Sequence, residues 1–153
     1  MGGANIQCGT FEGNDKSASP IVSVLEEAFA RAFGRKPRGR IRVRLAGLMR
    51  RPVAEDEAIA EAAILEVKFS EEGEIPPAVA RRLLPYLESY QAALLQQLNI
   101  PDDVDRIWEQ AARSTRAKYG TIPDPGWHLY CLHDLVPACR ISAADGIPVQ
   151  VLW

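Results

Sequence analysis

The stretch SPIVSVLEEAFARAFGRKPRGRIRVRL, residues 19–45, changes its hydrophobic period once, and this change predicts a fold with both helix and strand. Its first half repeats apolar side chains three and four residues apart, which is the spacing of a buried helix face. Ser19 is a suitable N-cap, Pro20 suits the first helical position because its N–H is not needed there, and Gly34 is a typical helix stop. Arginine and apolar side chains then alternate over residues 40–46, as in a half-buried strand.

Two further strands are predicted near the ends of the sequence. Residues 5–11 (NIQCGTF) are typical of a short strand and are followed by a polar loop. Residues 147–153 (IPVQVLW) are predicted to form the last strand, in a hairpin around Asp145-Gly146.

The acidic segment after the arginines predicts a helix followed by a strand. Residues 54–62 (AEDEAIAEA) are typical of a helix, and residues 63–69 (AILEVKF) of a strand that the polar SEEGE ends. The linker from strand 40–46 to strand 63–69 is long enough for a crossover helix, which would allow parallel pairing; antiparallel pairing stays open.

The second half of the chain predicts two helices with a short connector. One begins at Pro77 and keeps a continuous apolar face, with a kink or a fresh start expected at Pro85. The other begins at Asp102 and ends before Gly120, and the pair is predicted to pack as an antiparallel hairpin over about residues 77–119. The segment WHLYCLHDLVPACRIS that follows suits either a strand or a helix ended by Pro137.

Together these elements predict an α+β fold in a single domain, residues 1–153, with three to four helices packed on a mixed sheet of four to six short strands. A chain of 153 residues can bury roughly 70% of its extended surface, so it needs no disulfide or metal to fold. Its apolar runs are too short to cross a membrane, and its first fifteen residues lack the basic and apolar regions of a signal peptide. Three cysteines without a Cys-x-x-Cys pair favour reduced thiols, which predicts a cytoplasmic protein. We also expect no cofactor and no membrane partner.

Charge is strongly segregated along the sequence. Residues 28–54 carry nine Arg or Lys and no acid, whereas residues 55–74 carry eight Asp or Glu and one Lys. Arginines two apart on a strand share one face, and their planar guanidiniums bind phosphate bidentately. The leading hypothesis is therefore a non-enzymatic binding subunit that holds an anionic partner. The predicted anion-binding residues are Arg35, Arg38, Arg40, Arg42, Arg44, Arg50 and Arg51. Within this range, residues 34–52 hold most of the basic residues and have no aromatic residue on which bases could stack, so a nucleic-acid backbone is the specific partner predicted.

A structural explanation of the same arginines needs no partner molecule. The strand 40–46 could pair with strand 63–69, which would bring Glu66 near the arginines, and the helix over residues 55–61 could cover the rest. Exposed ion pairs of this kind are worth about 0–1 kcal/mol each.

The segment WHLYCLHDLVPAC, residues 127–139, holds both histidines and two of the three cysteines, which suggests a small enzyme as an alternative. Cys131 or Cys139 would be the nucleophile, His133 or His128 its base, and Asp134 the residue that orients the base. The odd separation of the two histidines does not suit a shared metal ion, and core packing of the segment explains its cysteines equally well.

The third hypothesis is an acidic protein-interaction module of the chaperone or immunity type, acting through the helical hairpin. The sequence contains none of the glycine-rich phosphate loops, zinc-protease motifs or serine-hydrolase motifs that would define an enzyme class.

Overall fold

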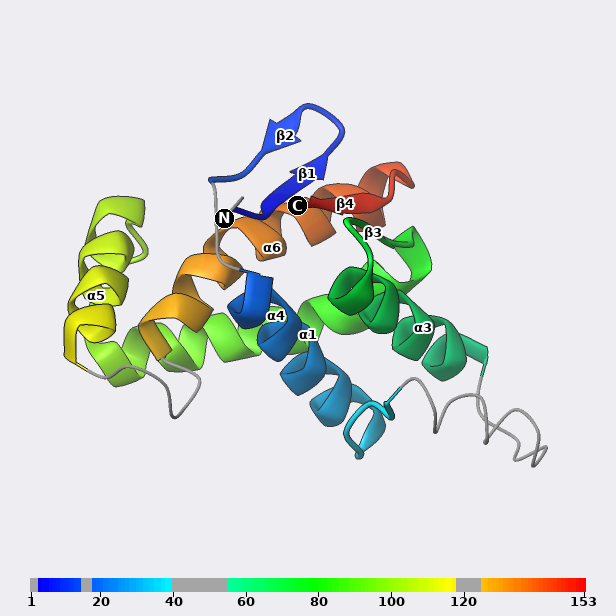
Figure 1. The fold of residues 1–153 in the computed structure, drawn as a ribbon, viewed down its shortest axis with the longest axis horizontal. Helices are drawn as coiled ribbons and strands as arrows, with labels where there is room; N and C mark the ends of the chain where they lie inside the picture. The colour runs from blue at the N-terminus through cyan, green and yellow to red at the C-terminus, as the bar shows by residue number, and fades with distance from the viewer. Residues whose placement is uncertain (1–2, 15–17, 40–54, 118–124) are drawn as a thin grey trace.

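Five helices and four strands make up the part of the chain that the structure, a computed structural model, describes: residues 3–14, 18–39, 55–117 and 125–153. The strands are β1 (Asn5–Cys8), β2 (Phe11–Glu12), β3 (Glu72–Ile75) and β4 (Val149–Leu152). The helices are α1 (Ala18–Phe33), α3 (Glu55–Phe69), α4 (Pro77–Leu98), α5 (Val104–Ala117) and α6 (Pro125–Asp145). The strands lie together on one side of the helices (Figure 1). The predicted α+β class is confirmed, but the predicted helix number is too low, and the described sheet is antiparallel throughout rather than mixed.

The described sheet has the order β2-β1-β4-β3, so the last strand of the chain lies between the first strand and β3. Val151 of β4 stands opposite Ile6 of β1 on one side and opposite Gly73 of β3 on the other. Alternate residues of β1 and β4 are buried, which gives the sheet one core-facing and one exposed face. The strand predicted over residues 147–153 is confirmed as β4, whereas the stretch 5–11 predicted as one strand contains β1, a turn at residues 9–10 and the start of β2.

The predicted strand 63–69 is wrong, because these residues form the second half of α3. Ala60, Ile64 and Val67 lie at helical spacing and are buried, and this packing outweighs the strand-forming preference of the side chains. The strand of this region is β3, which begins within the polar SEEGE that is predicted to end a strand. β3 packs directly on α3: a Cβ on Gly73 would lie 2.6 Å from the Cα of Val67, so only glycine fits there.

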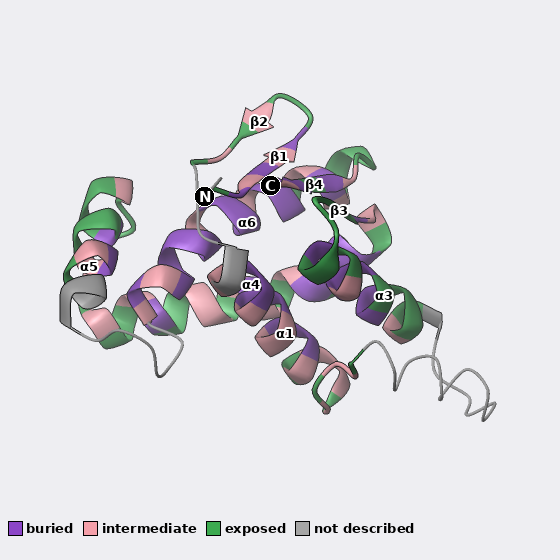
Figure 2. Cartoon of the chain, in the orientation of Figure 1, coloured by how far each residue is buried: buried purple, intermediate pink, exposed green. Residues whose placement is uncertain are grey.

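α6 is the helix around which the others are arranged. It packs against α1, α4, α5 and β1, and buried residues run along most of its length (Figure 2). The segment that suited either a strand or a helix is therefore a helix, and it continues through Pro137. α4 likewise continues through Pro85 without a fresh start.

The two helices predicted as an antiparallel hairpin both form, but they do not pack mainly on each other. α4 ends at Asn99, which adopts the left-handed conformation with φ of 51°, and α5 then turns away from α4 (Figure 1). Each packs against α6 instead. No helix of the described ranges has the length and hydrophobicity that crossing a membrane requires.

Two glycines end helices as left-handed residues. Gly34 has a φ of +71° and donates its N–H to the carbonyl of Ala30, which confirms the predicted end of α1. Gly146 has a φ of +69° and donates to the carbonyl of Ser142. The hairpin predicted around Asp145-Gly146 is therefore wrong, since the same two residues end α6.

Candidate functional site

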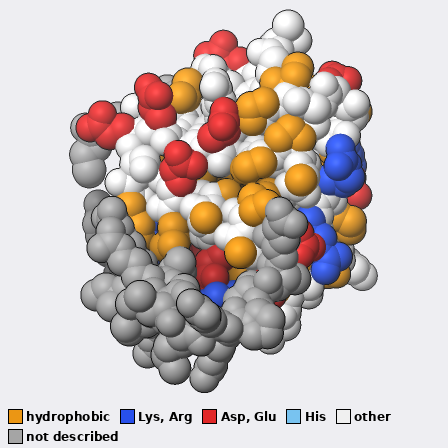
Figure 3. All heavy atoms as spheres, turned by 90° about the vertical axis from the view of Figure 1, so that its right-hand side faces the viewer, with side chains coloured by type: hydrophobic (Ala, Val, Ile, Leu, Met, Phe, Trp, Pro, Cys, Tyr) orange, Lys and Arg blue, Asp and Glu red, His pale blue; other side chains and the backbone are white. Residues whose placement is uncertain are grey.

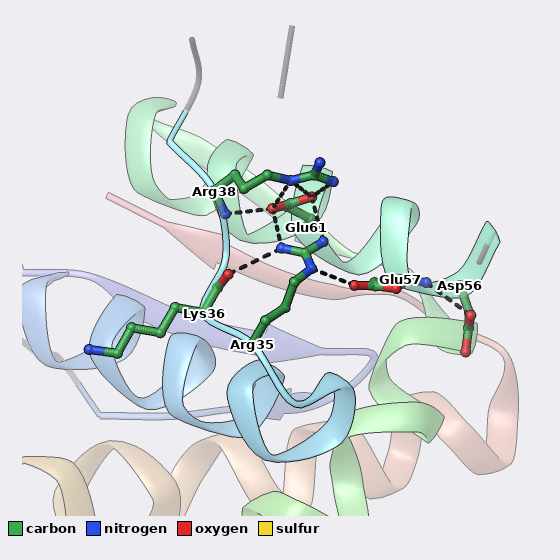
Figure 4. A network of polar contacts seen from close by, with 6 residues as sticks. All are labelled: Arg35, Lys36, Arg38, Asp56, Glu57 and Glu61. Atoms are coloured by element: carbon green, nitrogen blue, oxygen red, sulfur yellow. Dashed lines mark hydrogen bonds and ion pairs between the residues drawn. The ribbon is translucent and has the colours of Figure 1, made fainter. Parts of the chain in front are cut away.

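Arg35 and Arg38, the first two residues of the predicted anion-binding set, converge on one carboxylate of α3. The chain leaves α1 at Gly34 and then runs past α3, so both arginines face Glu61 (Figure 4). Glu61 is only 1% exposed, because it lies beside the buried apolar residues of α3. A buried carboxylate requires a partner of opposite charge, and here it has two.

Arg35 and Arg38 each donate hydrogen bonds to both carboxylate oxygens of Glu61. Arg35 donates from Nη1 to Oε1 at 2.9 Å and from Nη2 to Oε2 at 3.1 Å, which is a bidentate pair. Arg38 donates from Nη2 to Oε2 at 2.9 Å and from its backbone N–H to Oε1. Glu57, one turn earlier on α3, accepts from Nε of Arg35 at 2.6 Å. The two arginines and the two glutamates therefore balance in charge.

The electrostatics of this arrangement favour the charged forms. Burial alone would raise the pKa of Glu61, but the hydrogen bonds from Arg35 and Arg38 outweigh it and lower that pKa to about 2. The hydrogen bond to Glu61 also raises the pKa of Arg35. Glu61 and Arg35 therefore both stay ionised at neutral pH. We refer to Arg35, Arg38, Glu57 and Glu61 as the Glu61 cluster.

Aromatic rings of α1 border the Glu61 cluster. The guanidinium of Arg35 lies 5.1 Å from the ring centroid of Phe29, and that of Arg82 lies 5.2 Å from the ring of Phe33. Arg82 also pairs with Asp56 at 3.4 Å. The end of α1, the start of α3 and α4 are therefore joined by charged and aromatic contacts.

The remaining residues of the predicted anion-binding set, Arg40, Arg42, Arg44, Arg50 and Arg51, lie outside the described residues, as does the predicted strand 40–46. The structural explanation of the arginines is confirmed in one part, because the helix over residues 55–61 supplies partners for Arg35 and Arg38. Its other part is wrong, because Glu66 lies on a helix and not on a paired strand.

The candidate residues of the His/Cys segment have separate partners. His128 is buried and its Nδ1 lies 2.5 Å from the hydroxyl of Tyr90, whereas His133 contacts Asp102 at 3.2 Å. The buried carboxylate of Asp134 accepts the backbone N–H of Asn14 at 2.7 Å, which ties the loop after β2 to α6. Among described residues, no group of three His, Cys, Asp or Glu side chains could hold a metal ion.

The thiols lie in the core. Cys8, Cys131 and Cys139 are all buried. Burial raises the pKa of Cys8, with a further contribution from Asp145, and burial raises the pKa of Cys139 to about 12. An activated nucleophile needs the opposite shift, so these two thiols do not suit covalent catalysis.

Glu61 is the central residue that the sequence reasoning did not single out. The signal was available, because Glu61 falls next to the buried stripe of an otherwise apolar helix segment, AIAEAAIL. A carboxylate in such a position predicts a nearby cation, and the basic segment before α3 is the nearest source along the chain.

Comparison with protein-family models, with curated proteins and with solved structures finds no match for this chain. Its function is therefore inferred from its own residues.

Proposed function

We propose that this chain is a non-enzymatic binding subunit that holds an anionic partner, with a nucleic-acid backbone as the specific partner. The observation that carries the proposal is the charge balance of residues 35–51, which contain eight basic residues and no acid. Glu57 and Glu61 match the charges of two of these, Arg35 and Arg38, which leaves six basic residues beyond the Glu61 cluster.

In this proposal the Glu61 cluster fixes the start of the basic segment to α3. Residues further along contact phosphate oxygens, and these are Arg40, Arg42, Arg44, Arg50 and Arg51. Guanidinium groups suit this role because they stay charged and meet phosphate bidentately. Contacts of this kind hold a polyanion without reading its sequence.

A Cys/His enzyme has less support. The candidate nucleophile Cys131 is buried, and His128, His133 and Asp134 contact different parts of the molecule. We place the protein in the cytoplasm as part of the same proposal, since its three cysteines are all described and form no disulfide.

The test is fluorescence anisotropy with labelled oligonucleotides of random sequence, single- and double-stranded, at about 50 mM salt. We expect binding to duplex DNA that weakens about 500-fold between about 50 and 200 mM salt if all five arginines hold phosphates. The double variant Arg40→Glu plus Arg42→Glu should abolish binding.

The matched control is Arg106→Glu plus Arg113→Glu, which makes the same change in net charge on exposed positions of α5. This control should retain most of the affinity. Absence of binding at low salt, or an equal loss in both double variants, would rule the proposal out.

A further inference from the structure

β3 is the edge strand of the described sheet. It pairs with β4 on one side, and no described strand pairs with it on the other. An edge strand presents backbone N–H and C=O groups to which a further strand can bind.

The register shows which residues of β3 present these groups. The N–H of Trp153 donates to the carbonyl of Glu71 at 2.9 Å, so these two residues form a hydrogen-bonded pair of the antiparallel ladder. Bonded and non-bonded pairs alternate along such a ladder, so Gly73 is bonded to β4 and the residues on either side of it are not. The backbone groups of Glu72 and Glu74 therefore point away from β4, toward the side of β3 on which no described strand lies, and we refer to this side as the open edge.

The side chains of β3 give this edge two different faces. Glu72 and Glu74 are exposed on one face, and Gly73 and Ile75 are buried on the other. Because successive residues of a strand alternate between faces, a strand added here would place every second side chain beside the two glutamates. The side chains between them would continue the core-facing side of the sheet.

The helix under β3 supplies further apolar surface. On α3, Ile59 is 39% exposed and Phe69 is 58% exposed, which makes Phe69 the most exposed large hydrophobic side chain of the described residues. Figure 3 shows this side of the molecule, where exposed hydrophobic side chains lie between acidic side chains on the left and basic ones on the right.

We propose that the open edge of β3 binds an extended segment of a partner protein in which basic and apolar residues alternate. Antiparallel addition places two basic residues directly opposite Glu72 and Glu74, and it directs the apolar residues to the face that continues the core. A second copy of β3 does not fit this edge, since glutamates would then stand opposite glutamates.

The probe is a fluorescein-labelled peptide of eight residues that alternates arginine and valine, measured by anisotropy at about 150 mM salt. It should bind at least tenfold more tightly than two control peptides. One has glutamate in place of arginine, and the other has the same composition with the arginines grouped together.

Backbone pairing is tested by N-methylation of the peptide. In the antiparallel register the arginine N–H groups face β3 and the valine N–H groups face solvent. Methylation of the backbone nitrogens of the arginines should weaken binding at least tenfold. Methylation of the backbone nitrogens of the valines should change binding less than about twofold. This comparison uses the unaltered protein, so folding defects do not enter.

Charge reversal on the protein locates the site. The double variant Glu72→Lys plus Glu74→Lys should bind the arginine peptide at least tenfold more weakly than the unaltered protein does. It should bind the glutamate peptide more tightly. The control Asp105→Lys plus Glu109→Lys makes the same charge change on exposed positions of α5 and should change neither.

Equal binding of the alternating and grouped peptides, or no effect of arginine N-methylation, would reduce the interaction to general charge attraction and overturn the proposal. The peptide could also bind only to the triple variant Arg40→Ser, Arg42→Ser and Arg44→Ser. This result would mean that the basic segment of the same chain occupies the edge of β3, and it would overturn the proposal of a partner protein there.

Discussion

The carboxylate of Glu61 accepts hydrogen bonds from both the guanidinium and the backbone N–H of Arg38. The backbone contact means that Glu61 fixes the path of the chain as well as one side chain. With the bidentate pair to Arg35, the segment after α1 is held against α3 at two points. The start of the basic segment is therefore determined by one buried acid.

Glu61→Gln should lower the free energy of unfolding by about 2–4 kcal/mol, because an amide cannot balance the two guanidiniums. The matched control is Glu66→Gln, an exposed position on the same helix, which should stay within about 0.5 kcal/mol of the unaltered protein. Urea denaturation measures both. Equal effects of the two substitutions would contradict the central role of Glu61.

Acid should weaken the protein through the same residue. The pKa of Glu61 falls from 4.5 to about 2 on folding, which corresponds to roughly 3 kcal/mol of stability. Because the folded-state pKa is the lower one, this contribution is complete above about pH 5 and is lost as the pH falls from about 5 to 2. The stability difference between the unaltered protein and Glu61→Gln should therefore shrink over this range in urea titrations. A constant difference would contradict the assignment.

Gly73→Ala should destabilise the sheet by about 1–3 kcal/mol, since the new methyl group would meet the backbone of Val67 at 2.6 Å. Gly39→Ala is the control, because no described residue other than its chain neighbours has an atom within 4 Å of a Cβ at that position. Thermal unfolding compares the two. A Gly73→Ala protein as stable as the control would mean that β3 and α3 are further apart.

Asp134→Ala should release the loop after β2, because it removes the acceptor for the N–H of Asn14. We expect a loss of about 1–3 kcal/mol and faster amide exchange at Asn14. Asp102→Ala, which removes an exposed aspartate that contacts α6 through His133, should leave that exchange rate unchanged. Unchanged exchange in Asp134→Ala would show that the loop is held by other contacts.

The three thiols should react slowly in the native protein. Since they are buried, iodoacetamide at about pH 8 should label them at least 100-fold more slowly than in guanidinium chloride. A single native thiol that reacts rapidly would contradict this expectation and would favour the Cys/His enzyme instead.

Local patterns predicted the elements that depend on local chemistry. α1 has a helical stripe and a glycine stop, and β1 and β4 are short apolar segments; all three form where they were predicted. The arginine–glutamate pairing was predicted in outline as cover from residues 55–61, because opposite charges follow one another along the chain.

Elements that depend on distant contacts were not predicted. β3 is Glu-Gly-Glu-Ile, a composition that disfavours strands, and it forms because it pairs with β4 and because Gly73 fits over Val67. Asp145-Gly146 has the composition of a hairpin turn, yet a left-handed glycine serves a helix end equally well. The partner of α4 and α5 is α6, and no local pattern shows which helix packs on which.

The position of β4 between β1 and β3 has a consequence for how the protein is made. A ribosome delivers the β1–β2 hairpin and β3 before β4, and these two parts of the sheet cannot be joined until Val149–Leu152 has emerged. The described sheet therefore cannot be completed before β4 has been synthesised. Until then β1 and β3 lack the strand that lies between them, so the nascent chain depends on β4 for protection against aggregation.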